Sequence, residues 1–296
     1  MLSFCWPCLL SDLALTSKRC LYYLLIHSYM RLLFLLLFLP CVLRAQIPAT
    51  DSVRQSDTFR FVDAMFYTYT SPTRWKGKDW AKLGGIIAGT AVLSLADDPI
   101  RNFWLGKKGE ALDGINRIGY HYGKPYAGFA LTGGFYAAGL IFKSEWARET
   151  ALVLGTSLLS AGLMEMTLKP AIGRARPSTG EDNYTLTFFN PDVGFHSFPS
   201  GHASLAFTTS LVLARRVNNV PLKIVFYSMA ATTVMCRLYS DAHWITDIGF
   251  AGAIAWFCSD VALKRLSENR FRPMNVRRFK WKVQPYPSGL TVRATF

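Results

Sequence analysis

The chain has 296 residues, is 51% hydrophobic by composition and carries a formal net charge of +14. This length is sufficient for one domain with a sizeable core. An apolar body combined with excess positive charge favours a membrane or membrane-surface protein over a cytosolic one. The basic residues gather in loops and toward the C-terminal end instead of alternating with aromatic residues, so we expect no nucleic-acid partner.

An apolar run near the N-terminus has the features of a secretory signal peptide. A basic start at Met30 is followed by the apolar run 32–43 and then by the small residue Ala45. This pattern predicts cleavage after Ala45 and translation from Met30. A continuous membrane segment over 21–43 is the alternative. Four of the six cysteines lie in this leader, so no disulfide framework is expected.

Six helical stretches are predicted in the body of the chain, and they indicate an all-α fold, a bundle of about six helices with the active site at one end. Small residues such as Gly84-Gly85 and Gly133-Gly134 predict close helix contacts. Several stretches are shorter than the roughly 20 residues that cross a bilayer, so a compact periplasmic bundle is an alternative to a membrane-spanning one. The predicted helices cover about residues 82–97, 126–142, 149–168, 202–215, 221–236 and 247–263.

The expected domain organisation has four parts. Alternating polar and apolar residues over 290–296 are typical of a strand, which would need a partner strand. The parts are a leader (1–45), a linker that runs into a surface-lying helix (46–80), a catalytic helical domain (81–265) and a basic C-terminal tail (266–296).

Basic segments bear on the orientation in a membrane. The connection 215–223 and the segment 264–282 are rich in Lys and Arg, and both lie on the side opposite the predicted site. The positive-inside rule places that side in the cytoplasm and the site outside it. A cleaved signal peptide followed by six crossings would place the site inside, so the sequence leaves the orientation open.

Three clusters of residues in the central part of the chain are suited to phosphate chemistry. Cations can neutralise a phosphoryl group, and a serine hydroxyl with backbone N–H groups at a helix N-terminus adds neutral donors. With this many basic groups and no carboxylate cluster, neither a metal nor another cofactor is expected. The clusters contain Lys169 and Arg176; Ser200, Gly201 and His202; and Arg237, His243 and Asp247.

The two histidines allow a division of roles. Asp247 follows His243 by four residues, which is one helical turn, so its carboxylate can hold one imidazole nitrogen while the other attacks phosphorus. His202 would protonate the leaving oxygen and later activate water. This arrangement predicts two-step hydrolysis through a phosphohistidine.

The order and spacing of the clusters resemble the three-part signature of the type 2 phosphatidic acid phosphatase (PAP2) family. The matching elements are Lys169 and Arg176-Pro177 separated by six residues, Pro199-Ser200-Gly201-His202, and Arg237, His243 and Asp247 separated by five and three residues. That family shares its fold with bacterial class A acid phosphatases and vanadium haloperoxidases, and the resemblance covers about the central third of the chain.

The resemblance implies a role for each matched residue. His243 would be the nucleophile, His202 the acid, and Asp247 the residue that orients His243. The family often has serine directly before the arginine of the third motif, where this chain has Cys236, which puts one hydrogen bond in question. The implied phosphate-binding residues are Lys169, Arg176, Ser200, Gly201 and Arg237.

These observations predict a metal-independent phosphatase that hydrolyses a lipid phosphate monoester or a lipid-linked diphosphate. It would lie in the cell membrane with its active site facing the periplasm. Phosphatidate, phosphatidylglycerophosphate, undecaprenyl diphosphate and the phosphates of lipid A all fit this class. The alternatives are a soluble periplasmic acid phosphatase of the same fold, a vanadate-dependent haloperoxidase and a non-catalytic membrane protein.

Several polar residues fall outside the motifs. Asp97-Asp98 is predicted to end a helix, and His121 to lie in a loop. His196 is near the central motif in sequence but matches none of the three. Asp241 is a candidate for shaping the site.

Overall fold

The computed structural model describes residues 56–107, 109–269, 280–286 and 289–295. Up to residue 269 the described chain is helical except for loops and one isolated β-bridge between Arg174 and Leu186. Strand β1 (Lys280–Tyr286) then pairs antiparallel with β2 (Gly289–Thr295), so β1 is the partner that the predicted C-terminal strand required. The all-α class is confirmed for the body of the protein, whereas the predicted leader lies outside the described residues.

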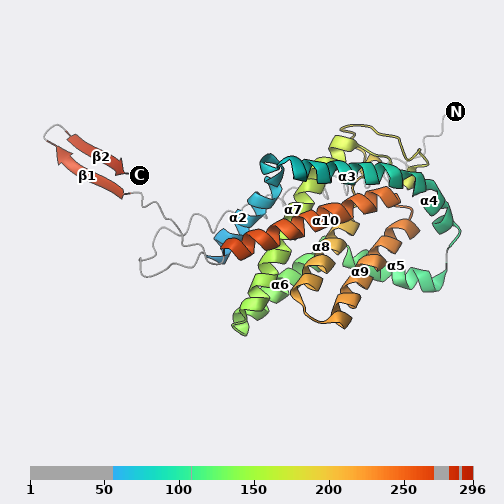
Figure 1. Ribbon diagram of the computed structural model, residues 1–296, viewed down its shortest axis with the longest axis horizontal. Helices are drawn as coiled ribbons and strands as arrows, with labels where there is room; N and C mark the ends of the chain where they lie inside the picture. Colours follow the sequence, from blue (N-terminus) through green and yellow to red (C-terminus); the bar gives the residue numbers. More distant parts are fainter. Residues whose placement is uncertain (1–55, 108, 270–279, 287–288, 296) are drawn as a thin grey trace, which may run out of the picture. The chain divides into compact units, whose positions relative to one another are not determined.

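Each of the six predicted helices is present, with bounds that differ by a few residues from those expected (Figure 1). The helix N-termini are set locally, because Ser144 and Asn219 accept hydrogen bonds from Ala147 and Leu222 and so cap two of them. The six are α3 (Gly77–Leu93), α6 (Pro125–Ile141), α7 (Glu145–Ile172), α8 (Gly201–Arg216), α9 (Val220–Tyr239) and α10 (Ile245–Asn269).

Three further helices lie outside the six predicted stretches. Helix α2 (Asp57–Tyr69) lies within residues 46–80, for which a linker running into a surface-lying helix was expected, and its buried face includes Arg60 and Thr68. Helix α5 (Glu110–Tyr122) contains His121, which is therefore helical and not in a loop as predicted.

The prediction for Asp97-Asp98 is also wrong. These residues begin α4 (Asp97–Leu105), which continues α3 through the short 3-10 helix η2 (Ser94–Ala96). Pro99 lies in the first turn of α4, where a missing backbone N–H does no harm, so the proline marks a helix start.

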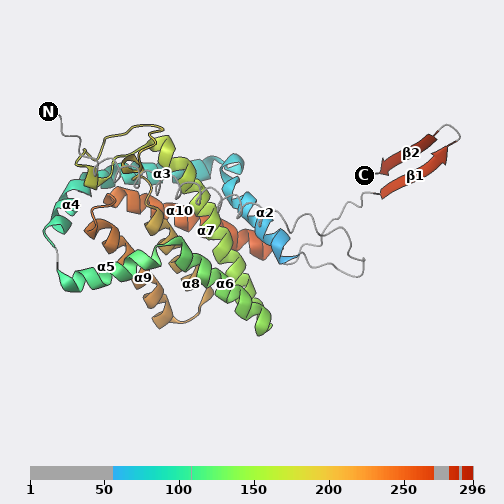
Figure 2. The same cartoon turned by 180° about the vertical axis from the view of Figure 1, so that it is seen from behind.

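Helices α7, α8 and α10 form the centre of the helical body (Figures 1 and 2). One cluster of buried residues joins α7 to its neighbours through Leu154 and Leu158 of α7, Val212 of α8 and Leu266 of α10. Helix α3 lies alongside α10 on one side. One loop joins the end of α7 to the start of α8, and another joins the end of α9 to the start of α10. Both loops lie at the same end of the bundle, and together they carry the predicted site.

Close helix contacts occur at glycines other than those predicted. A Cβ at any residue of Gly84-Gly85 or Gly133-Gly134 would meet no atom within 4 Å. At Gly119 of α5, in contrast, a Cβ would lie 2.3 Å from the backbone oxygen of Thr232 in α9. The absence of a side chain at this position lets α5 pack directly against α9. Glycine therefore does allow a close helix contact, but between a different pair of helices from those predicted.

The outer surface of the helices is strongly apolar. No residue of α3 is buried, although it carries Trp80, Ile87 and Val92, with the side chain of Val92 68% exposed. Such a surface is unfavourable in water and favourable in a bilayer. By length and composition, the segments Gly77–Leu105, Glu145–Ile172 and Ile245–Glu268 could each cross a membrane. The protein is accordingly a membrane protein.

Candidate active site

The loop between α7 and α8, residues 173–200, is folded back on itself and fixes the first motif. It leaves α7 at Gly173, whose φ of 60° favours glycine and where a Cβ would lie 1.8 Å from the Thr187 oxygen. Further along, Ser197 N donates to Arg174 O at 3.0 Å. The start and end of the loop are therefore held side by side.

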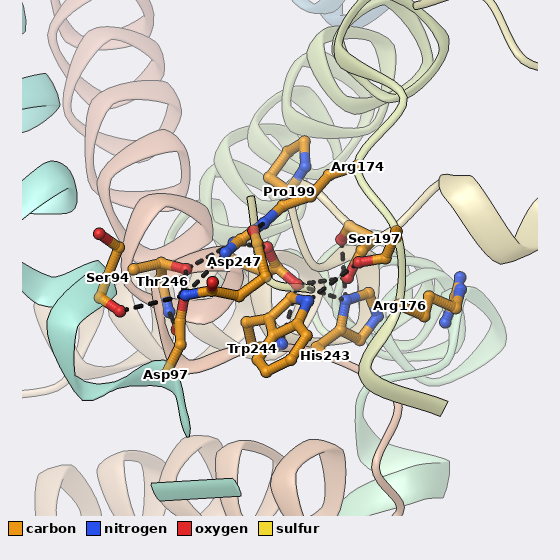
Figure 3. Close-up of polar contacts among 12 residues, drawn as sticks. Ser94, Asp97, Arg174, Arg176, Ser197, Pro199, His243, Trp244, Thr246 and Asp247 are labelled. Atoms are coloured by element: carbon orange, nitrogen blue, oxygen red, sulfur yellow. Dashed lines mark hydrogen bonds and ion pairs between the residues drawn. The ribbon is translucent and has the colours of Figure 1, made fainter. Parts of the chain in front are cut away.

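His243 is buried, and its ring orientation is determined by its Nδ1 atom. Nδ1 lies 2.8 Å from the carbonyl oxygen of Ser197 and 3.5 Å from Oδ2 of Asp247 (Figure 3). Both neighbours are acceptors, so the proton resides on Nδ1 and the lone pair on Nε2. Burial lowers the pKa of His243 to about 4, so the imidazole is neutral at neutral pH. A neutral ring with a free Nε2 is a competent nucleophile.

Asp247 lies one turn from His243, as predicted, but Ser197 provides the closer acceptor for the imidazole. The Asp247 carboxylate receives hydrogen bonds from Ser197 Oγ at 2.5 Å and from Trp244 N at 2.9 Å. Arg174 Nη1 donates to its other oxygen at 2.6 Å. Sequence reasoning missed Ser197, which has no signal beyond its nearness to the central motif.

Behind Asp247 lies a second buried carboxylate, that of Asp97. Arg174 bridges the two, because its Nη2 donates to Asp97 Oδ2 at 2.7 Å. Thr246 donates to Asp97 from both its backbone N, at 3.1 Å, and its hydroxyl, at 2.8 Å (Figure 3). Arg174 stands between Gly173 and Arg176 in the first motif, whereas nothing in the sequence connects Asp97 with the site.

Lys169 and Arg176 are held by neutral acceptors. Lys169 Nζ donates to Pro199 O at 2.5 Å and to His196 O at 3.3 Å. Arg176 donates to Ala242 O at 3.2 Å and to His196 O at 3.4 Å. Carbonyl oxygens fix the position of a cation without cancelling its charge. Both side chains therefore remain available to an anion.

Arg237 is buried among neutral groups. Its Nη2 donates to Cys236 Sγ at 3.0 Å, so the sulfur stands where the family often has a serine oxygen. Its Cζ lies 5.3 Å from the ring centroid of Tyr120 in α5. Sulfur is a weak acceptor, and an aromatic face supplies only a partial negative charge. The hydrogen bond that the sequence put in question is present in a weaker form.

The second motif starts α8 and faces Arg237. A Cβ on Gly201 would lie 2.9 Å from Glu165 Oε2, so a bulkier residue would clash with α7. The ring of His202 lies 5.3 Å from that of Tyr120. Burial, followed by the charge of Arg237, lowers the pKa of His202 to about 3.

Several buried atoms at this end have no hydrogen-bond partner among the described residues, Glu165 Oε1 and Asn183 Oδ1 among them. An unpaired buried polar atom is unfavourable, and clustering of such atoms indicates a binding site. Three further atoms of this kind belong to residues predicted to contact phosphate or to transfer a proton. They are Ser200 Oγ, His202 Nε2 and Arg237 Nε.

Of the residues outside the motifs, Asp241 does shape the site. Its carboxylate accepts from Arg101 at 2.9 Å and 3.0 Å, and Arg101 also donates to Pro177 O at 2.6 Å. This pair links the first and third motifs. His196 contributes its backbone oxygen, while its ring lies 2.8 Å from Asn190 O. The ring of His121 contacts Tyr126.

No group of three or more His, Cys, Asp or Glu side chains in the described part of the chain is arranged to hold a metal ion. Two of the buried carboxylates at this end, those of Asp97 and Asp247, are engaged by Arg174, and a third, that of Glu165, lies beside Gly201. The arrangement instead brings cations, neutral donors and a neutral imidazole together at one end of the helical bundle. Such a site is suited to bind and transfer an oxyanion.

The three motifs lie in a region that matches a known family model. Residues 150–271 match the model of the PAP2 superfamily, the family that the order and spacing of the motifs resemble.

Individual relatives are similar over about a third of the chain. A lipid A 1-phosphatase of Rhizobium etli is 33% identical over 100 residues, which are 32% of this chain and 41% of that protein. A lipid A 4'-phosphatase of Porphyromonas gingivalis is 28% identical over 114 residues, which are 36% of this chain and 48% of that protein. The matched region thus spans less than half the length of these curated relatives.

Two solved structures are also similar. The crystal structure of Aquifex aeolicus LpxE has a TM-score of 0.45 and 21% identity, covering 56% of this chain and 93% of that one. The structure of a transmembrane PAP2-type phosphatidylglycerolphosphate phosphatase from Bacillus subtilis has a TM-score of 0.48 and 19% identity, covering 64% and 98%.

Proposed function

We propose that this protein is a phosphatase that removes phosphate from a lipid phosphate monoester or a lipid-linked diphosphate through a phosphohistidine, without a metal. The observation that carries the proposal is the set of unpartnered polar atoms on Ser200, His202 and Arg237, at the same end of the bundle as the neutral imidazole of His243. A phosphoryl group offers the acceptor oxygens that these donors need.

The first step breaks the bond between phosphorus and the leaving oxygen. His243 Nε2 attacks phosphorus while Lys169, Arg176 and Arg237 neutralise the phosphoryl oxygens. His202 gives its proton to the leaving oxygen. Burial and the charge of Arg237 lower the pKa of His202, whereas the negative charge of a bound phosphate raises it, so substrate binding favours the protonated form that acts as the acid.

The second step regenerates the enzyme. His202, now neutral, accepts a proton from water, and the resulting hydroxide attacks phosphorus. The P–N bond to His243 breaks, and its electron pair returns to Nε2. Throughout both steps the Nδ1 proton of His243 stays directed at Ser197 O and Asp247, which stabilise the positive charge on the ring.

A lipid substrate is favoured by the apolar outer surface and by the names of the similar proteins. The polar site belongs to a helical body whose apolar surface is suited to a bilayer, which favours a substrate that is itself in the membrane. Two of the relatives are named for lipid A, and we place the phosphates of lipid A first among the candidate substrates.

The site is proposed to face the periplasm. Arg215, Arg216 and Lys223 lie at the α8–α9 connection, at the end of these helices opposite the site. The positive-inside rule places that connection in the cytoplasm. Labelling of cysteines introduced at the two ends by a membrane-impermeant reagent in intact cells tests this orientation. Labelling of the α8–α9 connection from outside would reverse it.

Phosphate release by the purified protein in detergent with EDTA tests the activity. The panel contains phosphatidate, undecaprenyl diphosphate, lipid A and a soluble aryl phosphate. We expect release from at least one lipid. Equal turnover of the aryl ester would favour a soluble-type acid phosphatase, and inhibition by EDTA that Mg²⁺ reverses would contradict the metal-free chemistry.

Removal of the nucleophile tests the mechanism. His243→Ala should lower turnover by about a thousandfold or more, because no other group can form the P–N bond. His121→Ala is the matched control, since His121 lies in α5 and contacts only Tyr126 and Tyr120 among the ring and hydrogen-bond partners described. A His243→Ala protein with a large fraction of wild-type activity would exclude the phosphohistidine.

A further inference from the structure

Asp97 is a buried carboxylate that lies outside the three motifs, yet all its partners but one belong to or adjoin them. It is 1% exposed and accepts from Thr246 N at 3.1 Å and from Arg174 Nη2 at 2.7 Å. The remaining partner is Asn183 Nδ2, at 3.4 Å. A carboxylate this deeply buried is retained only with such partners.

Its contacts with Thr246 hold the first turn of α10. The side chain of Asp97 comes from α4 and accepts the free backbone N–H of Thr246, so it caps a helix to which it does not belong. The negative charge also interacts favourably with the N-terminus of α10. The next residue in that turn is Asp247. Asp97 therefore fixes the backbone from which the partner of His243 projects.

Its contact with Arg174 sets the local charge. Arg174 donates one nitrogen to Asp247 at 2.6 Å and the other to Asp97 at 2.7 Å, so one cation is shared by two anions. The three groups together carry one net negative charge beside His243. If Asp97 were neutral, Arg174 would cancel Asp247, and the net charge would be zero.

We propose that Asp97 is a positioning residue of the phosphatase reaction, which acts through Thr246 and Arg174 to hold Asp247 and to keep one net negative charge beside His243. The inference rests on the proposed function of the site. The imidazole gains positive charge when it is phosphorylated, so the extra anion stabilises the transition state and the intermediate more than the free enzyme.

Several charged groups besides Asp97 influence the charge of the His243 ring. Lys169 and Arg176 oppose a positive charge on His243, and Asp247 favours it. These cations are needed for phosphate, so the compensating anion has to come from behind the histidine. The ionisable groups that face His243 are Asp247 of α10, Lys169 of α7, Arg176 of the α7–α8 loop and His202 of α8.

The test compares Asp97→Asn with Asp98→Asn. Both changes remove one negative charge from the first turn of α4, but the side chain of Asp98 is exposed. Turnover of the best lipid substrate is measured from pH 3.5 to 8, together with KM, the thermal midpoint and inhibition by inorganic phosphate.

We expect Asp97→Asn to lower kcat by about tenfold or more and to change KM and the phosphate inhibition constant by less than about threefold. The acidic limb of its kcat profile should move to lower pH by about half a unit or more, because the imidazolium loses a nearby anion. Asp98→Asn should match wild type in each measurement.

Three outcomes would overturn the inference: a wild-type kcat, an unmoved acidic limb, or the same changes in Asp98→Asn. A lower thermal midpoint with an unmoved limb would mean a structural role alone. If Asp97→Asn does not fold, Thr246→Val carries the test, since it removes the hydroxyl that donates to Asp97; an unchanged kcat would then count against the inference. An inactive wild-type protein would contradict the proposed function itself.

Discussion

Arginines are buried at both ends of α7, and their surroundings differ. At the start of α7, Arg60 of α2 bonds Glu149 at 2.8 Å and approaches Asp57 at 3.6 Å, while Arg148 also bonds Asp57. Two cations and two anions give this cluster no net charge. At the other end, Arg174 is shared by two carboxylates, and Arg237 has no carboxylate partner among the described residues.

This difference in charge balance distinguishes a cluster that holds helices together from one that is suited to bind and transfer phosphate. A balanced cluster such as that of Arg60 joins α2 to α7 and, through Leu266 O, to α10. The unbalanced end has surplus negative charge behind His243 and surplus positive charge at Arg237. A phosphoryl transfer through a histidine requires both, because the phosphoryl oxygens are negative and the phosphorylated ring is positive. In the proposed reaction, these separated charges would stabilise the phosphoryl oxygens and the phosphorylated ring.

The largest expected effects come from replacing Arg174 at one end of α7 and Arg60 at the other. Arg174→Met leaves two buried carboxylates without their shared cation and should lower the free energy of unfolding by about 3–5 kcal/mol. Arg60→Met should destabilise the fold by a similar amount. Activity separates the two variants: per folded molecule, Arg60→Met should retain kcat within about threefold, whereas Arg174→Met should lose it by about 100-fold or more. Unfolding in detergent and turnover are measured on the same preparations. Equal losses of kcat would contradict the division between the two ends.

A smaller effect is expected from acid. The pKa of His243 is lowered to about 4 in the folded protein and is about 6.5 in the unfolded chain, so the unfolded chain binds more protons between these values. The stability contributed by neutral His243 is complete above pH 6.5 and declines as the pH falls toward 4. We expect His243 to account for a loss of about 2 kcal/mol between pH 7.5 and 5, to which His202, whose pKa is also lowered, adds. Unfolding midpoints at both pH values measure it.

His243→Asn should show a smaller acid loss than wild type, whereas His121→Asn, which alters an exposed histidine, should retain the full loss. The Arg60 cluster contains no histidine, so substitutions there should leave the difference between the two pH values unchanged. An acid loss in His243→Asn equal to that of wild type would assign the effect to another group.

The smallest effect concerns the acceptor of Arg237. Cys236→Ser replaces the sulfur, which lies 3.0 Å from Nη2, with a stronger acceptor and should lower KM by about two- to threefold, with little change in kcat. Cys258→Ser is the control, because that buried thiol contacts Met164 and not the site. A KM that is unchanged by Cys236→Ser would show that the sulfur already holds Arg237 adequately.

The apolar pattern predicted the helices well where one face is apolar and poorly where polar residues are buried. The predicted range 247–263 lies inside α10, whereas the bounds of α2 could not be predicted within residues 46–80 because Arg60 and Thr68 occupy its buried face. Pairing of a buried arginine with an acid on another helix leaves no periodic signal. The glycine pattern was also misleading, because whether a glycine lies at a close helix contact depends on which helix packs against it, and the sequence does not show this.

The sequence by itself determined the three motifs, their order, the helical class and the apolar character of the surface. These follow from residue type and from spacing along one chain, which local geometry converts into faces and turns. Only the tertiary structure decided that Ser197 provides the nearest acceptor for His243 and that Asp97, 149 residues from Thr246, caps α10. Such contacts depend on how helices pack against one another, and packing brings together residues that have no fixed separation in the sequence.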